Sequence, residues 1–174
     1  MLCSIYSLEI LYKKYTSNSR LSFLCVPLER SEKGMEYFME KLKIYFAGSI
    51  RGGRNKAEDY KKIADYIEEY AEILDKHVVD PNLNSKGESI KANEIYERDI
   101  NWIKQCDILI AEVTNPSLGV GYEIAYAEKL GKKIICLCEK NTNLSAMING
   151  NPNLDVISYL SVCELKDKLL DRLA

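Results

Sequence analysis

The sequence lacks the marks of several protein classes. No apolar run is long enough to cross a membrane as a helix, and neither positive charge nor a small-residue cleavage site accompanies the apolar residues near Met1. The six cysteines include no CxxC pair. We therefore expect a cytoplasmic protein that makes no membrane contact, with reduced and mostly structural thiols rather than a disulfide framework or a zinc site.

A strong charge of either sign is also missing. The 24 Lys and Arg residues nearly balance the 26 Asp and Glu residues, so the net charge is −2 and the pI is about 5.6. This balance speaks against a nucleic acid polymer or a membrane surface as the partner, although a local basic pocket remains compatible with it. Hydrophobic residues make up 47% of the chain and charged residues 29%, as in globular proteins.

The first 40 residues differ from the rest of the chain. Their apolar residues recur at mixed spacings, whereas regular patterns begin at Lys41. We predict that residues 1–40 are an N-terminal extension outside the compact domain, which begins near Met39 and occupies residues 41–174. A folded accessory helix is the alternative for the first segment.

Strand and helix patterns alternate from Lys41 onward. The expected strands are residues 44–47, 73–79, 107–113, 133–138 and 156–159. One helix is expected to start near residue 55, and three others are expected at residues 92–105, 120–130 and 162–173. A short helical turn is expected around residues 145–148. This alternation predicts an α/β fold, with a doubly wound parallel five-stranded sheet and helices on both faces.

A glycine-rich turn follows the first strand. It holds Ser49, Arg51, Gly52, Gly53 and Arg54 just before a helix. Glycines let the backbone approach a ligand, a helix N-terminus offers free N–H groups, and a guanidinium matches phosphate oxygens. The turn therefore favours a phosphate site, with an ordinary turn that needs glycine as the alternative. Its spacing fits neither a Walker A loop nor the dinucleotide fingerprint.

Two carboxylates are candidates for chemistry. Glu123 lies in the first turn of the helix that follows Ser117, Gly119 and Gly121. An acidic residue there is common for dipole reasons alone, but the two glycines weaken the helix start unless something approaches the backbone. Asp99 lies within a helix, where a solvated charge is the alternative. A pair of carboxylates beside a phosphate turn indicates attack on a sugar and protonation of its leaving group.

Three further side chains have structural interpretations that we prefer from the residues alone. His77, the only histidine, is expected to end the second strand, where it either lines the crevice or has a structural role. Trp102 is expected in the core. Tyr122 is expected to pack rather than react.

Four stretches resemble the 2′-deoxynucleoside 5′-phosphate N-hydrolases, within the nucleoside 2-deoxyribosyltransferase family. They are Tyr45-Phe-Ala-Gly-Ser-Ile-Arg-Gly-Gly-Arg54, Asp99 with Trp102, Ala111-Glu-Val-Thr-Asn-Pro-Ser-Leu-Gly-Val-Gly-Tyr-Glu123 and Leu144-Ser-Ala-Met-Ile148. The first and third are long and specific. The resemblance covers about residues 43–173 and leaves residues 1–40 outside.

The resemblance implies a flavodoxin-like fold, a homodimer, and hydrolysis of deoxynucleoside monophosphates to a free base and 2-deoxyribose 5-phosphate. It also implies a preference for purines, especially guanine. We expect no metal or organic cofactor, because two carboxylates supply both the nucleophile and the proton.

The resemblance also assigns roles to individual residues. Glu123 matches a nucleophile that forms a covalent deoxyribosyl-enzyme, Asp99 matches the general acid, and Tyr45 matches a tyrosine that orients the nucleophile. The substrate-binding candidates are Ser49, Ile50, Arg51, Gly52, Gly53, Arg54, His77, Ser117, Gly119, Ser145 and Met147. Among these, Ser49, Arg51 and Ser117 match phosphate ligands, and Ser145 matches a phosphate ligand that the other subunit supplies. A helix cap at Ser117 and a plain loop residue at Ser145 are the alternatives.

Other functions remain open at this point. A nucleoside 2-deoxyribosyltransferase would pass the sugar to a second base, but it has no use for a phosphate turn. A ribonucleotide N-glycosidase on the same fold is another alternative. A nucleotide-binding module without turnover is the third, and it would need neither Glu123 nor Asp99.

Overall fold

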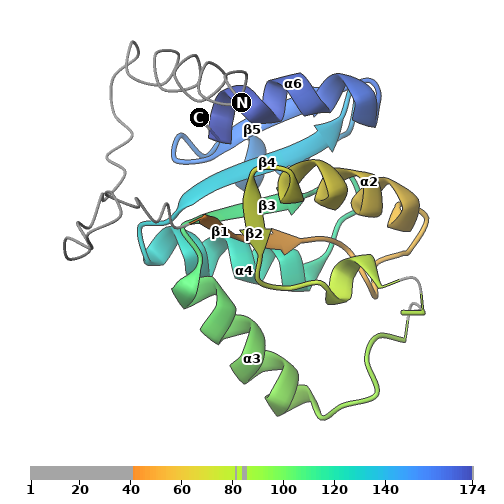
Figure 1. The fold of residues 1–174 in the computed structure, drawn as a ribbon, viewed down its shortest axis with the longest axis vertical. Helices are drawn as coiled ribbons and strands as arrows, with labels where there is room; N and C mark the ends of the chain where they lie inside the picture. Colours follow the sequence, from red (N-terminus) through yellow and green to blue (C-terminus); the bar gives the residue numbers. More distant parts are fainter. Residues whose placement is uncertain (1–40, 81, 84–85, 174) are drawn as a thin grey trace, which may run out of the picture. The chain divides into compact units, whose positions relative to one another are not determined.

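The computed structural model describes residues 41–80, 82–83 and 86–173. The strands are β1 (Leu42–Ala47), β2 (Ala71–Ile73), β3 (Ile108–Glu112), β4 (Lys133–Glu139) and β5 (Asp155–Tyr159), as Figure 1 shows. The helices are α2 (Ala57–Glu68), the short 3₁₀ helix η1 (His77–Val79), α3 (Ala92–Gln105), α4 (Leu118–Lys129), α5 (Ala146–Asn149) and α6 (Val162–Leu173). The predicted segment of residues 1–40, with the proposed start near Met39, lies outside the described residues.

The five strands form one parallel sheet in the order β2-β1-β3-β4-β5. This confirms the predicted doubly wound α/β fold, and the order is the flavodoxin-like one. The chain reverses its direction of winding between β1 and β3. Ligands in such folds bind beyond the carboxyl ends of the strands at this switch point. The turns after β1 and β3 are therefore the turns that frame a site.

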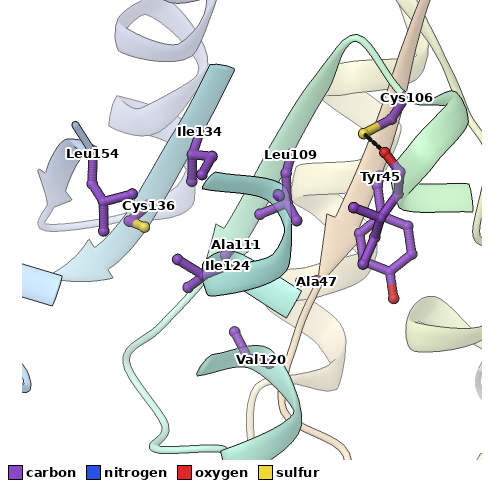
Figure 2. Packing of buried hydrophobic residues seen from close by; sticks show 12 residues of the cluster. Tyr45, Ala47, Cys106, Leu109, Ala111, Val120, Ile124, Ile134, Cys136 and Leu154 are labelled. Atoms are coloured by element: carbon purple, nitrogen blue, oxygen red, sulfur yellow. Dashed lines mark hydrogen bonds between the residues drawn. The ribbon is translucent and has the colours of Figure 1, made fainter. Parts of the chain in front are cut away.

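Helices cover both faces of the sheet because neighbouring strand residues point to opposite sides. Tyr45 and alternate residues of the central strands pack against α3 and α4, as Figure 2 shows in part. Phe46 points the other way, and its ring meets that of Tyr60 on α2 edge-on at 6.2 Å. Helix α6 lies beside α2, because Lys166 pairs with Glu69 at 2.7 Å.

The prediction for the second strand was wrong in position as well as length, because the observed strand shares only Ile73 with it. We expected residues 73–79 to form it, but β2 ends at Ile73 and residues 77–79 form η1. The cause is a side chain: the N–H of Phe46 donates to Oδ1 of Asp75 at 2.7 Å. A carboxylate thus takes the place of the next backbone acceptor, and the chain leaves the sheet. His77 therefore lies in the 3₁₀ turn, not at a strand end.

No helix in the described part of the chain is both long and apolar enough to cross a membrane.

Candidate active site

A cavity of about 690 Å³ opens at the carboxyl ends of β1 and β3, between the two turns and helices α3 and α4. Nine of the fourteen predicted site residues line it: Tyr45, Ile50, Arg51, Gly52, His77, Asp99, Ser117, Gly119 and Glu123. The other five, Ser49, Gly53, Arg54, Ser145 and Met147, do not. The structure therefore brings together all three predicted catalytic residues.

Glu123 lines the cavity from the first turns of α4. The hydroxyl of Tyr45 on β1 donates a hydrogen bond to its carboxylate. Burial and the nearby charge of Asp99 raise the pKa of Glu123 to about 7, and the Tyr45 bond acts in the opposite direction. Burial and the Glu123 charge also raise the pKa of Tyr45, so its hydroxyl keeps its proton and acts as a donor.

Asp99 comes to the same cavity from α3 and is 9% exposed. Burial raises its pKa above the ordinary value, whereas His77 and a hydrogen bond from Arg98 lower it. The two acidic side chains therefore have different surroundings: Tyr45 donates a neutral hydrogen bond to Glu123, and a cation accompanies Asp99. Paired acids with different surroundings are the arrangement that separates a nucleophile from an acid.

Arg98 is a part of the site that the sequence did not identify. Its guanidinium lies 2.9 Å from Oδ1 of Asp99 and binds both oxygens of Glu88, at 2.6 and 2.7 Å. Its guanidinium carbon also lies 4.8 Å from the centre of the Trp102 ring. Arg98 thus ties the loop before α3 to the general-acid candidate. Only the alternation of acidic and basic residues hinted at it.

Trp102 has two faces in different environments. It packs against the buried cluster around Tyr45, as expected for a core residue. Its ring also stacks on His77, with 5.9 Å between the ring centres and 15° between the planes. His77 lines the cavity beside it, so the sequence alternative in which His77 reaches the crevice is the observed one.

Asp75 is the second residue that the sequence analysis missed. It lines the cavity and is 1% exposed. Burial, Glu123 and Asp99 raise its pKa well above the ordinary value. The available signal was an acidic residue directly after a short apolar strand, but we assigned that segment to the strand itself.

The turn after β1 is packed tightly against the turn after β3. A Cβ atom on Gly52 would lie 2.5 Å from the carbonyl oxygen of Pro116 and 2.7 Å from Oγ of Ser49. Gly53 has a φ of 132°, which side chains rarely adopt. The glycines of this turn therefore serve a close backbone contact as well as the turn itself.

The polar side chains of this turn have different partners. Oγ of Ser49 is buried and has no hydrogen-bond partner in the described part of the chain, so it is available to a ligand. Arg51 lines the cavity beneath Gly87, whose Cβ would lie 3.2 Å from the arginine Nε. Arg54 instead donates to the carbonyls of Val78 and Asp80, at 2.5 and 3.0 Å. These bonds give Arg54 a structural role outside the cavity.

Ser117 caps α4, since its Oγ accepts from the N–H of Val120 at 3.4 Å, and it also lines the cavity. The turn that carries it is anchored by Glu112, whose carboxylate accepts from the hydroxyls of Thr114 and Tyr159. Oε2 of Glu112 is buried and has no hydrogen-bond partner among the residues that the structure describes. Glu112 does not line the cavity, so we assign it to the support of the turn.

Ser145 and Met147 lie on exposed chain. Oγ of Ser145 caps the short helix α5 by accepting from the N–H of Met147 at 3.3 Å. Leu118, Met147, Tyr96 and Tyr122 are 97%, 79%, 52% and 52% exposed. Tyr122 was expected to pack, and it does so only in part, by stacking on Tyr126. We call Tyr96, Leu118 and Tyr122 the apolar rim, because all three also line the cavity.

The arrangement suits acid–base chemistry by side chains. Among residues 41–173, outside the gaps at 81 and 84–85, no group of three or more His, Cys, Asp or Glu side chains could hold a metal ion.

Residues 44–158 match the model of the nucleoside 2-deoxyribosyltransferase family. The chain belongs to this family. The match runs from β1 to β5 and includes the three predicted catalytic residues.

Named relatives agree with this assignment. The chain is 41% identical over 127 residues to a 5-hydroxymethyl-dUMP N-hydrolase of Tetraodon nigroviridis, covering 71% of this chain and 89% of the relative. It is 41% identical over 150 residues to a protein of Methanosarcina mazei named as a 2′-deoxynucleoside 5′-phosphate N-hydrolase, covering 84% and 93%. The solved CMP N-glycosidase of Clostridium botulinum is similar with a TM-score of 0.57 and 25% identity, over 75% of this chain and 98% of that one.

Proposed function

We propose that this protein hydrolyses the N-glycosidic bond of 2′-deoxynucleoside 5′-monophosphates, releasing a free base and 2-deoxyribose 5-phosphate. The observation that carries the proposal is the meeting of Glu123 and Asp99 in one cavity, with Tyr45 bonded to the first and Arg98 to the second. The relatives' names supply the bond and the substrate class. A pure binding module would need neither carboxylate.

Glu123 acts as the nucleophile in the first step. Its carboxylate attacks the anomeric carbon, the bond to the base nitrogen breaks, and the bonding pair leaves with the base. Asp99 donates its proton to that base. The Tyr45 hydrogen bond orients Glu123 and keeps a fraction of it ionised despite its burial. The Arg98 guanidinium stabilises the Asp99 carboxylate that remains.

Water completes the reaction in the second step. It attacks the anomeric carbon of the deoxyribosyl-enzyme and gives a proton to Asp99, and the Glu123 carboxylate leaves. Two displacements at one carbon retain its configuration. Without a 2′-hydroxyl the oxocarbenium-like state is reached more easily, which favours deoxy substrates.

The phosphate binds where the two glycine-bearing turns meet. Arg51 and Ser117 line the cavity there, and the unpartnered Oγ of Ser49 lies beneath Gly52. A phosphate dianion matches a guanidinium, hydroxyl donors and backbone N–H groups. Gly119 and Ile50 complete this wall of the cavity.

The protein acts as a homodimer in this proposal. The apolar rim is exposed in the single chain, and a second copy that covers it would also close the cavity. Ser145 lies outside the cavity of its own chain, which fits a ligand that it supplies to the partner's phosphate site. The cytoplasmic location and the preference for purines remain predictions.

The test is product analysis by chromatography. Purified protein is incubated with dGMP, 5-hydroxymethyl-dUMP, GMP, CMP and deoxyguanosine, each with and without a second free base. Base release from the deoxynucleotides alone supports the proposal. Exchange onto the added base from deoxyguanosine would identify a transferase, and release from GMP or CMP a ribonucleotide N-glycosidase. If no substrate reacts, the protein is a binding module.

Trapping distinguishes the covalent route. In Asp99→Asn the second step lacks its base, so an activated substrate that needs no leaving-group protonation should leave a deoxyribosyl phosphate adduct on Glu123, detectable by mass spectrometry. Asp99→Asn/Glu123→Gln is the matched control and should carry no adduct. If Asp99→Asn turns over the activated substrate but carries no adduct, the covalent step is overturned.

A further inference from the structure

Two buried polar atoms face each other at one wall of the cavity. Oδ2 of Asp75 and Nδ1 of His77 lie 3.9 Å apart, and neither has a hydrogen-bond partner among the described residues. This separation is about 1 Å longer than a hydrogen bond. Buried donors and acceptors are nearly always paired, so two that face each other without partners need an explanation.

Neighbouring groups hold both side chains so that Oδ2 of Asp75 stays opposite Nδ1 of His77. Oδ1 of Asp75 accepts from the N–H of Phe46 at 2.7 Å, which fixes the carboxyl plane at the end of β1. The imidazole of His77 stacks on Trp102, so it turns only within the plane of that stack. Nε2 is on the ring edge away from Asp75, and His77 lines the cavity. A small rotation of the ring would pair Nδ1 with Oδ2.

We propose that Asp75 is a positioning residue that hydrogen-bonds Nδ1 of His77 when substrate fills the cavity, so that His77 presents Nε2–H to a carbonyl oxygen of the nucleobase. The proposal implies that the substrates are nucleotides whose base carries a carbonyl oxygen on the edge that faces Nε2 of His77. This inference rests on the proposed function for its substrate.

The donor character of Nε2 follows from where protons reside in the pair. Burial, Glu123 and Asp99 raise the pKa of Asp75, and burial lowers the pKa of His77. Both shifts favour a protonated Asp75 beside a neutral His77, with one proton shared between Oδ2 and Nδ1. Nε2 keeps its own hydrogen whether that shared proton is on the carboxyl or on the ring.

At higher pH, Nε2 of His77 changes from a hydrogen-bond donor to an acceptor. Once the pair loses a proton, ionised Asp75 accepts from Nδ1–H and Nε2 is left with a lone pair. The other charged groups that act on His77 are Asp99 and Glu88, which favour the imidazolium, and Arg98 and Arg54, which oppose it. They shift the pH of the change but not its direction, because the carboxyl group that faces Nδ1 at 3.9 Å is that of Asp75.

The variant Asp75→Asn tests whether ionisation of Asp75 controls which nitrogen of His77 carries the hydrogen. Asparagine retains an oxygen for the N–H of Phe46 and places an NH₂ group opposite Nδ1, which must then accept. Nε2 therefore keeps its hydrogen at every pH at which the ring is neutral. The matched control is Glu112→Gln, since Glu112 is also a fully buried carboxylate with one unpartnered oxygen but lies outside the cavity.

The first measurement uses ¹⁵N NMR of labelled histidine, which needs no assignment because the chain has one histidine. The sample is the protein saturated with 2-deoxyribose 5-phosphate plus free guanine. In the unmodified protein the hydrogen should move from Nε2 to Nδ1 as the pH rises. In Asp75→Asn it should stay on Nε2, whereas Glu112→Gln should match the unmodified protein. If the hydrogen also stays on Nε2 in the unmodified protein throughout the pH series, as in Asp75→Asn, the pairing is overturned.

The second measurement compares substrates whose bases carry either a carbonyl or an amino group at the same ring position, dIMP with dAMP and dUMP with dCMP. The ratio of their kcat/KM values cancels the ionisation of Glu123 and Asp99, which both substrates need. We expect the preference for the carbonyl-bearing base to fall about tenfold with rising pH in the unmodified protein, the loss of roughly one hydrogen bond, and to stay constant in Asp75→Asn. Equal pH dependence in both proteins would refute the inference. A protein inactive on these four nucleotides and also on dGMP and 5-hydroxymethyl-dUMP would refute the proposed function, while the NMR result would still decide the pairing.

Discussion

Arg98 and Asp99 are neighbours in the sequence and are also ion-paired, with 2.9 Å between Nη2 and Oδ1. Adjacent helical residues ordinarily point in different directions, so this contact requires the arginine to fold back over its own helix. Glu88 holds it there from the other side. The cation therefore sits beside the group that must both lose and regain a proton during the reaction.

Arg98→Met should move the alkaline limb of the activity profile to higher pH. The Arg98 hydrogen bond and charge lower the pKa of Asp99, so their removal lets Asp99 keep its proton longer. We also expect kcat to fall about tenfold, because the carboxylate formed in the first step loses its partner. The check is kcat against pH. Lys61→Met, which removes an exposed helical ion pair with Asp65, is the control and should leave the profile unchanged.

Tyr45→Phe should move the acidic limb to higher pH. The Tyr45 hydrogen bond favours the ionised form of Glu123, whose pKa is about 7, so its loss raises that pKa further. At pH 6 the variant should be slower than at pH 8 by a larger factor than the unmodified protein. The measurement is kcat/KM from pH 5 to 9, and an unshifted acidic limb would show that Tyr45 does not control Glu123.

Gly52→Ala should cost most of the activity because its Cβ would meet the Pro116 carbonyl at 2.5 Å and push the two phosphate turns apart. We expect KM for the nucleotide to rise by at least tenfold and the thermal midpoint to fall. Gly121→Ala is the matched control in α4, where a Cβ would meet nothing within 4 Å. Alanine there should raise stability by about 0.5–1 kcal/mol with little change in KM. Equal effects of the two substitutions would contradict the close contact.

Mixing two inactive variants tests whether Ser145 acts in the partner's site. Ser145→Asp should repel the phosphate, and Glu123→Gln should abolish the nucleophile. If subunits exchange freely, half of the dimers combine both variants, and one of their two sites has an intact Glu123 and an intact Ser145. Activity should then recover to about a quarter of the unmodified value. No recovery despite exchange, followed by a mass tag, would place Ser145 outside the partner's site.

Much of the fold was predictable because its signals are local. The alternation of apolar strands with amphipathic helices predicted the parallel sheet, and the sheet's switch point then brought the turns after β1 and β3 together. Glu123 and Asp99 could be placed in one cavity for the same reason, since their helices follow loops at the same edge of the sheet.

The remaining features depend on contacts that sequence spacing does not reveal. Asp75 ends β2 by reaching a backbone N–H 29 residues away, so its role cannot be inferred from its neighbours. In the sequence, Arg98 looks like any other charged residue on a helix. Its role depends on Glu88, which reaches it only because the loop before α3 folds back onto the helix. Arg54 has the residue type and position of a phosphate ligand, yet the carbonyls of η1 and the next residue occupy its guanidinium.

The three-residue length of β2 also affects how separate molecules meet. In the described part of the chain β2 is an edge strand, and an edge with unpaired backbone groups is a template on which another chain can add. A strand of three residues presents only a brief template, and the turn into Asp75 and η1 carries the backbone away before a longer ladder can form. The side chain that ends this strand therefore also limits edge-to-edge aggregation in concentrated solution.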